Sequence, residues 1–150
     1  MVSLDLLTRC ISLAIKDIRG FSIFPKTISS DAEYEATCYY IGLPSTPVSV
    51  YRTGTPFKRP TGPEAYHIWR EVMPVFDHLI ADAWDELGPL VPDYLDSINV
   101  TWTTIDVVRL AEEEKEPGPP VLWIGVKPGS LSREDAQVAT VGCEGLLKKV

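Results

Sequence analysis

The sequence predicts a single α+β domain, in which a mixed or mainly antiparallel sheet is covered by about three helices. Segments rich in apolar and β-branched residues predict strands at 100–110 and 121–126. Apolar residues at helical spacing predict helices at 4–19, 64–87 and 132–148. With 150 residues, 45% of them hydrophobic, the chain is long enough for one core and too short for two.

The N-terminal third is predicted to hold one helix and two or three strands. The helix at 4–19 carries apolar residues three and four positions apart, and a glycine follows it as a stop signal. Aromatic and β-branched residues then predict strands at 21–28, 33–41 and 48–51. The stretch at 52–62 has prolines, glycines and basic residues without a periodic pattern, so we expect a flexible loop there.

The middle of the chain is predicted to be helical. Pro63 suits the first position of a helix, and Pro74 ends or kinks the segment that follows it. The apolar stripe at 76–87 is the clearest helical pattern in the sequence. A short helical turn at 92–98 is expected after it.

The C-terminal part alternates between strands, a loop and a helix. A flexible acidic loop at 111–120 precedes the apolar run at 121–126, which predicts a strand buried on both faces. Ser132, with Asp135 three positions later, matches a capping box at the start of the last helix. The sequence ends in or just after this helix, at Val150, and a further strand would complete a strand–helix–strand unit. Without that strand we expect an empty sheet position or an exposed edge, and with it self-association, strand exchange or dependence on a partner.

The charge of the chain argues against polyanionic partners. The net charge is −7, and residues 61–150 carry seven basic against sixteen acidic side chains. Such a surface repels nucleic acid and anionic membranes, so we predict neither as a partner. The basic cluster of Arg52, Lys58 and Arg59 is expected to be solvated in its loop, with docking of an acidic partner as the alternative.

The compartment can be predicted from the cysteines and the N-terminus. The three cysteines are odd in number and far apart, which favours buried free thiols in a reducing compartment. Charged residues interrupt the apolar residues near the N-terminus, so neither a signal peptide nor a membrane span is predicted. We expect a cytoplasmic protein, with the nucleus left open.

Catalytic and metal-binding patterns are missing from the sequence. His67 and His78 have no second ligand at the spacing of a zinc site. The glutamates at 112–114 and 116 are nearly contiguous, whereas a calcium loop alternates its ligands around a glycine, so a solvated hairpin loop is the better interpretation. We predict no catalytic residue, no metal and no cofactor, and we expect the four tryptophans to pack in the core.

One local arrangement offers a mechanism for binding. The predicted strand at 121–126 leads through a turn into a helix whose first amides lack partners, and Lys127 adds a positive charge. Such a junction can hold a phosphate or carboxylate, although an N-cap and a Pro–Gly turn explain the same residues more simply. The candidate anion-binding residues are Lys127, Gly129, Ser130 and Ser132.

Three stretches of the chain carry a family resemblance: YRTGTPFKRPTGPEAYHI at 51–68, YLDSINVTWTTIDVVRLAE at 94–112 and VLWIGVKPGSLSREDA at 121–136. They resemble an uncharacterised family that is abundant in mushroom-forming fungi. In longer members this region looks like an N-terminal module, followed by a strand and a part similar to trypsin-like serine proteases that this chain does not contain. The resemblance implies a fold and no nameable activity. The matching residues are mostly turn, cap and core types: Gly54, Pro56, Gly62, Pro63, Asp96, Trp102, Asp106, Trp123, Pro128, Gly129 and Ser132.

From the sequence we favour a non-catalytic protein-interaction or regulatory module over an enzyme. The reasons are the missing catalytic constellation and the resemblance to the leading region of larger proteins. The alternative is a small-ligand enzyme or anion-binding domain that uses the junction at 127–132. A self-assembling structural protein is a third class. We therefore expect a protein partner or self-association, and a small anion as the ligand of the alternative.

Overall fold

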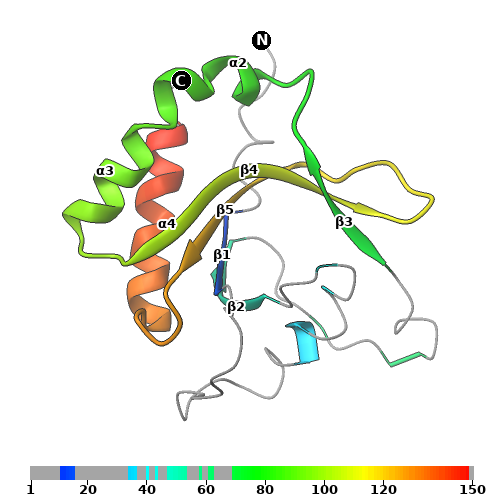
Figure 1. The fold of residues 1–150 in the computed structure, drawn as a ribbon, viewed down its shortest axis with the longest axis horizontal. Coiled ribbons are helices and arrows are strands. Elements are labelled where there is room, and N and C mark those ends of the chain that lie inside the picture. Colours follow the sequence, from blue (N-terminus) through cyan, green and yellow to red (C-terminus); the bar gives the residue numbers. More distant parts are fainter. Residues whose placement is uncertain are drawn as a thin grey trace.

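One mixed sheet, with helices packed against part of it, forms the fold (Figure 1). The computed structural model describes residues 11–15, 34–36, 40, 43, 47–53, 58, 61–62 and 69–148. Its strands are β1 (Ile11–Ile15), β2 (Val48–Arg52), β3 (Arg70–Pro74), β4 (Trp102–Glu112) and β5 (Pro120–Val126). Its helices are α2 (Leu79–Leu87), α3 (Leu90–Ser97) and α4 (Arg133–Leu147). The predicted α+β class is confirmed.

The sheet has the strand order β2-β1-β5-β4-β3, which places β5 at its centre. β1 runs parallel to β5, and the other three neighbouring pairs are antiparallel, so the predicted mixed sheet is confirmed. Of the two alternatives expected from the sequence, an empty position is not found between the described strands, whereas β2 and β3 are the outer strands of the sheet that they form. A parallel neighbour needs only a long crossover connection, and a strand from far away in the sequence can supply it as well as the next strand can.

The core lies between the sheet and the helices α2, α3 and α4 (Figure 1). Leu122, Ile124 and Val126 of β5 pack in it, and full burial of such a side chain stabilises the fold by about 1.5–3 kcal/mol. On the other face of β5, Val121 is buried and the ring of Trp123 meets the Tyr40 ring edge-on at 5.6 Å. The predicted burial of β5 on both faces is confirmed. The helical side chains of this core are Ile80, Leu87, Val91, Leu95, Ala136, Ala139, Cys143 and Leu147.

Helix α4 begins where the capping box predicts. The hydroxyl of Ser132 accepts a hydrogen bond from the backbone N–H of Asp135 at 3.1 Å and donates one to the Asp135 carboxylate at 2.8 Å. Further along, Gly142 lets Tyr94 of α3 lie directly on the α4 backbone, because a Cβ atom at Gly142 would overlap the Tyr94 hydroxyl. That hydroxyl donates to the carbonyl of Val138 at 3.3 Å. α3 and α4 therefore pack closely side by side, as Figure 1 shows.

The predicted helix at 4–19 is wrong over residues 11–15, which form β1. In the sequence ISLAI, apolar residues fit the helical spacing and also alternate with Ser12 and Ala14 as they would in a strand. Pairing with β2 and β5 decides between the two periods, and one sequence segment alone cannot show that pairing. The rest of the predicted helix lies outside the described residues.

Two of the predicted N-terminal strands have different outcomes. The strand at 48–51 is confirmed as β2, which also includes Arg52. The strand at 33–41 is wrong at 34–36, which are helical, and Tyr40 lies in a turn; residues 33, 37–39 and 41 lie outside the described residues. The strand predicted at 21–28 lies outside the described residues.

The predicted helix at 64–87 is wrong over residues 70–74 and confirmed over 79–87. Residues 70–74 form β3, which pairs with the end of β4, with Val72 opposite Leu110. A proline is tolerated at the end of such an edge strand, because no ladder bond is lost there. The short helical turn expected at 92–98 is present as α3, and residues 64–68 lie outside the described residues.

The two predicted loops are shorter where the structure describes them. Arg52 belongs to β2, residues 111–112 belong to β4 and Pro120 belongs to β5. The connection between β4 and β5 is therefore the turn at 113–119. Long strands on both sides make the β4–β5 pair a hairpin that reaches beyond the helices (Figure 1).

Candidate binding surface at the projecting end of the sheet

The sheet extends beyond its helices at one end, which we call the projecting end (Figure 1). It consists of β3, the part of β4 from Arg109 onward, and the turn at 113–119. The helix-packed core contains no residue of β3 and none of β4 beyond Val107. Among the described residues, strand pairing and side-chain contacts within the projecting end hold it to the rest of the sheet.

Hydrogen bonds fix the turn at 113–119 on the strands beside it. The N–H of Gly118 donates to the carbonyl of Leu110 at 2.9 Å, and the Arg109 guanidinium donates to the carbonyl of Gly118 at 2.8 Å. The N–H of Lys115 donates to the carbonyl of Glu112 at 3.0 Å. Glu114 has a φ of +62°, a left-handed conformation that is uncommon for non-glycine residues and occurs mostly in turns. The acidic segment is thus a defined turn.

Charged side chains join β3 to the end of β4. The guanidinium of buried Arg70 lies 2.8 Å from the carboxylate of Glu112, and the other oxygen of that carboxylate lies 2.5 Å from the Lys115 ammonium. The hydrogen bond from Lys115 and the positive charge of Arg70 lower the pKa of Glu112, against an opposing effect of burial. Glu112 is therefore an ionised carboxylate whose negative charge is balanced by Arg70 and Lys115, and it links β3 to the end of β4.

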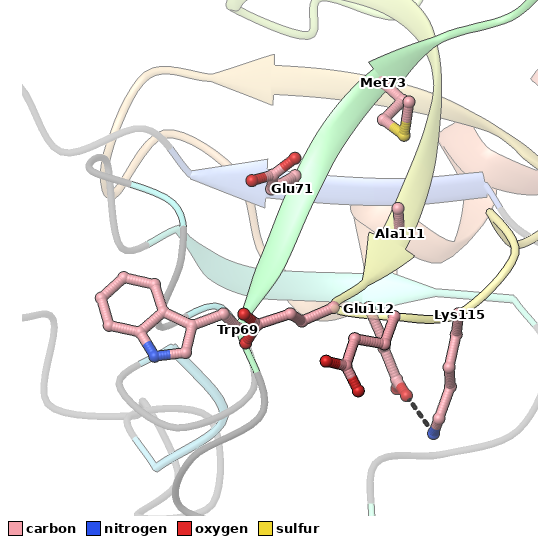
Figure 2. A pocket seen from close by; sticks show the side chains of 8 residues that line it. Trp69, Glu71, Met73, Ala111, Glu112 and Lys115 are labelled. Atoms are coloured by element: carbon pink, nitrogen blue, oxygen red, sulfur yellow. Dashed lines mark hydrogen bonds and ion pairs between the residues drawn. The ribbon is translucent and has the colours of Figure 1, made fainter.

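A cavity of about 520 Å³ opens on the projecting end (Figure 2). The strand register places Glu71 opposite Ala111 and Met73 opposite Arg109, so Glu71, Met73 and Ala111 lie on one face of the sheet. Figure 2 shows the lining contributed by β3 on one side and by the end of β4 and its turn on the other. The lining residues are Trp69, Glu71, Met73, Ala111, Glu112, Glu113, Glu114 and Lys115.

The charge of this cavity is strongly negative. Four glutamates and one lysine line it, which leaves three negative charges in excess. Glu112 has cationic neighbours, whereas Glu71, Glu113 and Glu114 are exposed and make no ion pair with any described residue. The cavity therefore presents three carboxylates to solvent.

Large apolar side chains are exposed in and beside the projecting end. Trp69 is 55% exposed and Phe76 is 71% exposed, and between them Val72 and Met73 are also exposed. Leu79, at the start of α2, continues the series. Isolated exposed apolar residues are common on protein surfaces, whereas these five lie within eleven consecutive positions, with Trp69 and Met73 on one face of β3 and Val72 on the other.

The backbone of β3 has one side that does not face β4. The carbonyl of Trp69 accepts a hydrogen bond from Glu113 N–H at 3.2 Å, and alternate residues of an antiparallel strand face their partner. Val72 therefore directs its N–H and C=O groups away from β4. Among the described strands, none pairs with that side of β3.

The four candidate anion-binding residues lie together in the exposed turn between β5 and α4. The N–H and the hydroxyl of Ser130 donate to the carbonyl of Lys127 at 3.1 and 2.6 Å, and Gly129 has a φ of +71°. The Ser132 hydroxyl caps α4, and Glu134 with Asp135 adds negative charge to the first turn. These bonds are the ones that the plain turn and N-cap interpretation predicts. Anion binding stays a prediction.

Arg52 and His78, two side chains that the sequence analysis considered as candidates for sites, have structural roles. Arg52, expected in a solvated loop, lies 2.6 Å from buried Glu35, so that expectation was wrong for Arg52. Burial raises the pKa of Glu35, and the charge of Arg52 opposes this. His78 is the N-cap of α2, and its Nδ1 accepts from the N–H of Ile80 at 3.1 Å. Lys58 is exposed, while Arg59 and His67 lie outside the described residues.

The sequence did not indicate the cavity because it predicted helix for the β3 side of it. Trp69 was expected in the core, and its exposure shows that this expectation was wrong; Trp84, Trp102 and Trp123 are partly buried. No sequence pattern around Glu71 or Met73 indicated a cavity or a strand. The available signal was the run EEEK between two predicted strands, which marks a hairpin but does not show which segment pairs beside it.

The comparisons with known proteins add no relative. No family model, curated protein or solved structure matches this chain. Of the helices that the structure describes, none is long and apolar enough to cross a membrane. Within the described parts of the chain, no three His, Cys, Asp or Glu side chains are grouped so as to hold a metal ion.

Proposed function

We propose that this chain is a non-catalytic protein-interaction module, and that the projecting end of the sheet is its binding surface. The observation that carries the proposal is the series of exposed apolar side chains at Trp69, Val72, Met73 and Phe76, on and beside an edge strand. Hydrophobic side chains at a sheet edge supply binding energy, and the strand supplies backbone hydrogen bonds to an added strand.

The geometry favours a different protein as the partner over a second copy of this chain. If two β3 strands paired antiparallel about Val72, Arg70 would lie opposite Pro74, which has no N–H to donate. In a pair of two β3 strands this loss would occur twice, whereas a different strand added beside Val72 meets Pro74 only once. We therefore propose a heterologous partner in a reducing, cytoplasmic compartment, which is consistent with the buried free thiol of Cys143.

The test is site-specific photo-crosslinking in extracts of the cells that produce the protein. A photoreactive phenylalanine replaces Val72 in one variant and Val138, an exposed residue of α4, in the control. We expect one defined protein adduct from position 72 and none from position 138. Equal adducts from both positions, or adducts from neither, would reject the projecting end as the binding surface.

The rival function, binding of a small anion at the turn between β5 and α4, has no comparable support. The hydroxyls of Ser130 and Ser132 already bond within the turn and the cap. Lys127→Ala tests it directly, because this exposed side chain supplies the positive charge of that site. Saturable phosphate binding that Lys127→Ala abolishes, with the fold intact, would establish the anion-binding function.

A further inference from the structure

We infer that the partner segment is extended and basic, and that it adds to the outer edge of β3 with lysine or arginine side chains in the cavity beside Trp69 and Glu71. This inference rests on the proposed function and names the chemistry of its partner. It draws on three features of the projecting end: the charge of the cavity, the side of β3 that no described strand pairs with, and the exposed apolar side chains of β3.

Charge complementarity selects a cation. The three exposed carboxylates of Glu71, Glu113 and Glu114 line the cavity, while Glu112 is already neutralised by Arg70 and Lys115. An acidic or neutral segment would leave these carboxylates uncompensated or repelled. Glu71 belongs to β3 on one side of the cavity, and Glu113 and Glu114 belong to the turn on the other, so basic side chains of one segment can approach both sides.

The strand register gives the spacing of the basic residues. A strand that adds to the outer side of β3 would pair with the backbone N–H and C=O groups of Val72. Its side chains beside Glu71 and Met73 would lie on the cavity face, and the side chain beside Val72 would lie on the other face. The partner segment is therefore expected to carry basic residues at every second position, with apolar residues between them.

The apolar lining suits a long basic side chain better than a small cation. Trp69 and Met73 expose apolar surface next to the carboxylates. The methylene stem of a lysine or arginine can lie along that surface while its charged end reaches the glutamates. Trp69 adds a cation–π contact, which at an exposed site contributes about 0.5–1 kcal/mol.

The experiment is a titration of the intact chain with a synthetic peptide, acetyl-Lys-Val-Lys-Thr-Lys-Val-Lys-amide, followed by backbone amide NMR. The matched control peptide carries glutamate in place of every lysine. We expect shifts at Glu71, Val72 and Met73 with the lysine peptide only, and weaker binding as salt is raised, because exposed charge pairs are screened. A lysine peptide with N-methylated backbone amides, which cannot pair along the strand, should lose binding.

Variants of the chain test whether the lysine peptide binds to the cavity or is attracted only by the net negative charge of the protein. Glu71→Gln should raise the dissociation constant of the lysine peptide about two- to fivefold, the range of a surface ion pair. Glu86→Gln, which removes an exposed carboxylate from α2 instead, should leave it unchanged. Trp69→Ala should weaken binding by about two- to fivefold as well.

Four results would overturn the inference: no binding of the lysine peptide, equal binding of the glutamate peptide, equal effects of Glu71→Gln and Glu86→Gln, or dimers that form through β3. The proposed function fails in a different way, by the absence of a crosslink specific to position 72. A specific crosslink together with a silent lysine titration would therefore reject the basic partner and keep the interaction surface.

Discussion

The two halves of β4 lie in different surroundings: the first half packs in the core that stabilises the fold, and the second half lines the proposed binding surface. Near its start, Ile105 and Val107 pack against the core that β5 shares with the helices. Near its end, Glu112 pairs with Arg70 and Lys115 beside an open cavity. One continuous strand thus connects the helix-packed core to the projecting end, and the described part of that core does not reach past Val107 of β4.

The largest expected difference between the two regions is in the cost of removing an apolar side chain. Leu95→Ala empties a fully buried position of α3 and should lower the free energy of unfolding by about 2–5 kcal/mol. Val72→Ala, at the exposed edge, should change it by less than about 0.5 kcal/mol. Urea denaturation of both variants measures this contrast. Similar losses would show that the projecting end is part of the core.

The contact of α3 with α4 predicts a loss from adding a single methyl group. Gly142→Ala would force the Tyr94 side chain away from α4, and overpacking of this kind costs about 1–3 kcal/mol. The control is Gly145→Ala on the same helix, where nothing lies within 4 Å of the added atom. It should stabilise the protein by about 0.5–1 kcal/mol, because alanine is the better helix former. Thermal unfolding distinguishes the two signs, and equal signs would refute the close contact.

The start of α4 predicts a smaller effect. Ser132→Ala removes the N-cap and should cost about 1 kcal/mol of unfolding free energy. Ser130→Ala removes an exposed hydroxyl that bonds only to the carbonyl of Lys127, and should cost less than about 0.5 kcal/mol. Chemical denaturation measures both variants. If Ser130→Ala lost more unfolding free energy than Ser132→Ala, the hydroxyl of Ser130 in the turn would contribute more to stability than the N-cap of α4.

The smallest effect is a pH dependence at the start of α2. Burial, and secondarily the charge of Arg109, lowers the pKa of His78 from its usual 6.5. The unfolded chain therefore binds this proton more readily, so the contribution of His78 is complete above pH 6.5 and is lost as pH falls through the folded-state value. Asparagine also caps helices but does not titrate. His78→Asn should therefore lose less stability than the wild type between pH 7.5 and pH 5, measured by urea unfolding at each pH.

The sequence predicted the C-terminal part of the fold well because its signals there are local. The capping box at Ser132 and the apolar run of β5 depend on neighbouring residues alone, and both are present where expected. β1 and β3 were predicted as helix, because their short segments also fit helical spacing and only pairing with distant strands makes them strands. The cavity could not be predicted, since it exists only where β3 lies beside the end of β4.

The most direct test of the binding surface is amide hydrogen exchange of the intact chain with and without the lysine peptide. The N–H of Val72 points away from β4, so it should exchange quickly in the free protein and become protected on binding. We predict protection confined to β3 and the turn at 113–119, with α3 and α4 unchanged. Protection over the helices, or none anywhere, would contradict the assignment of binding to the projecting end.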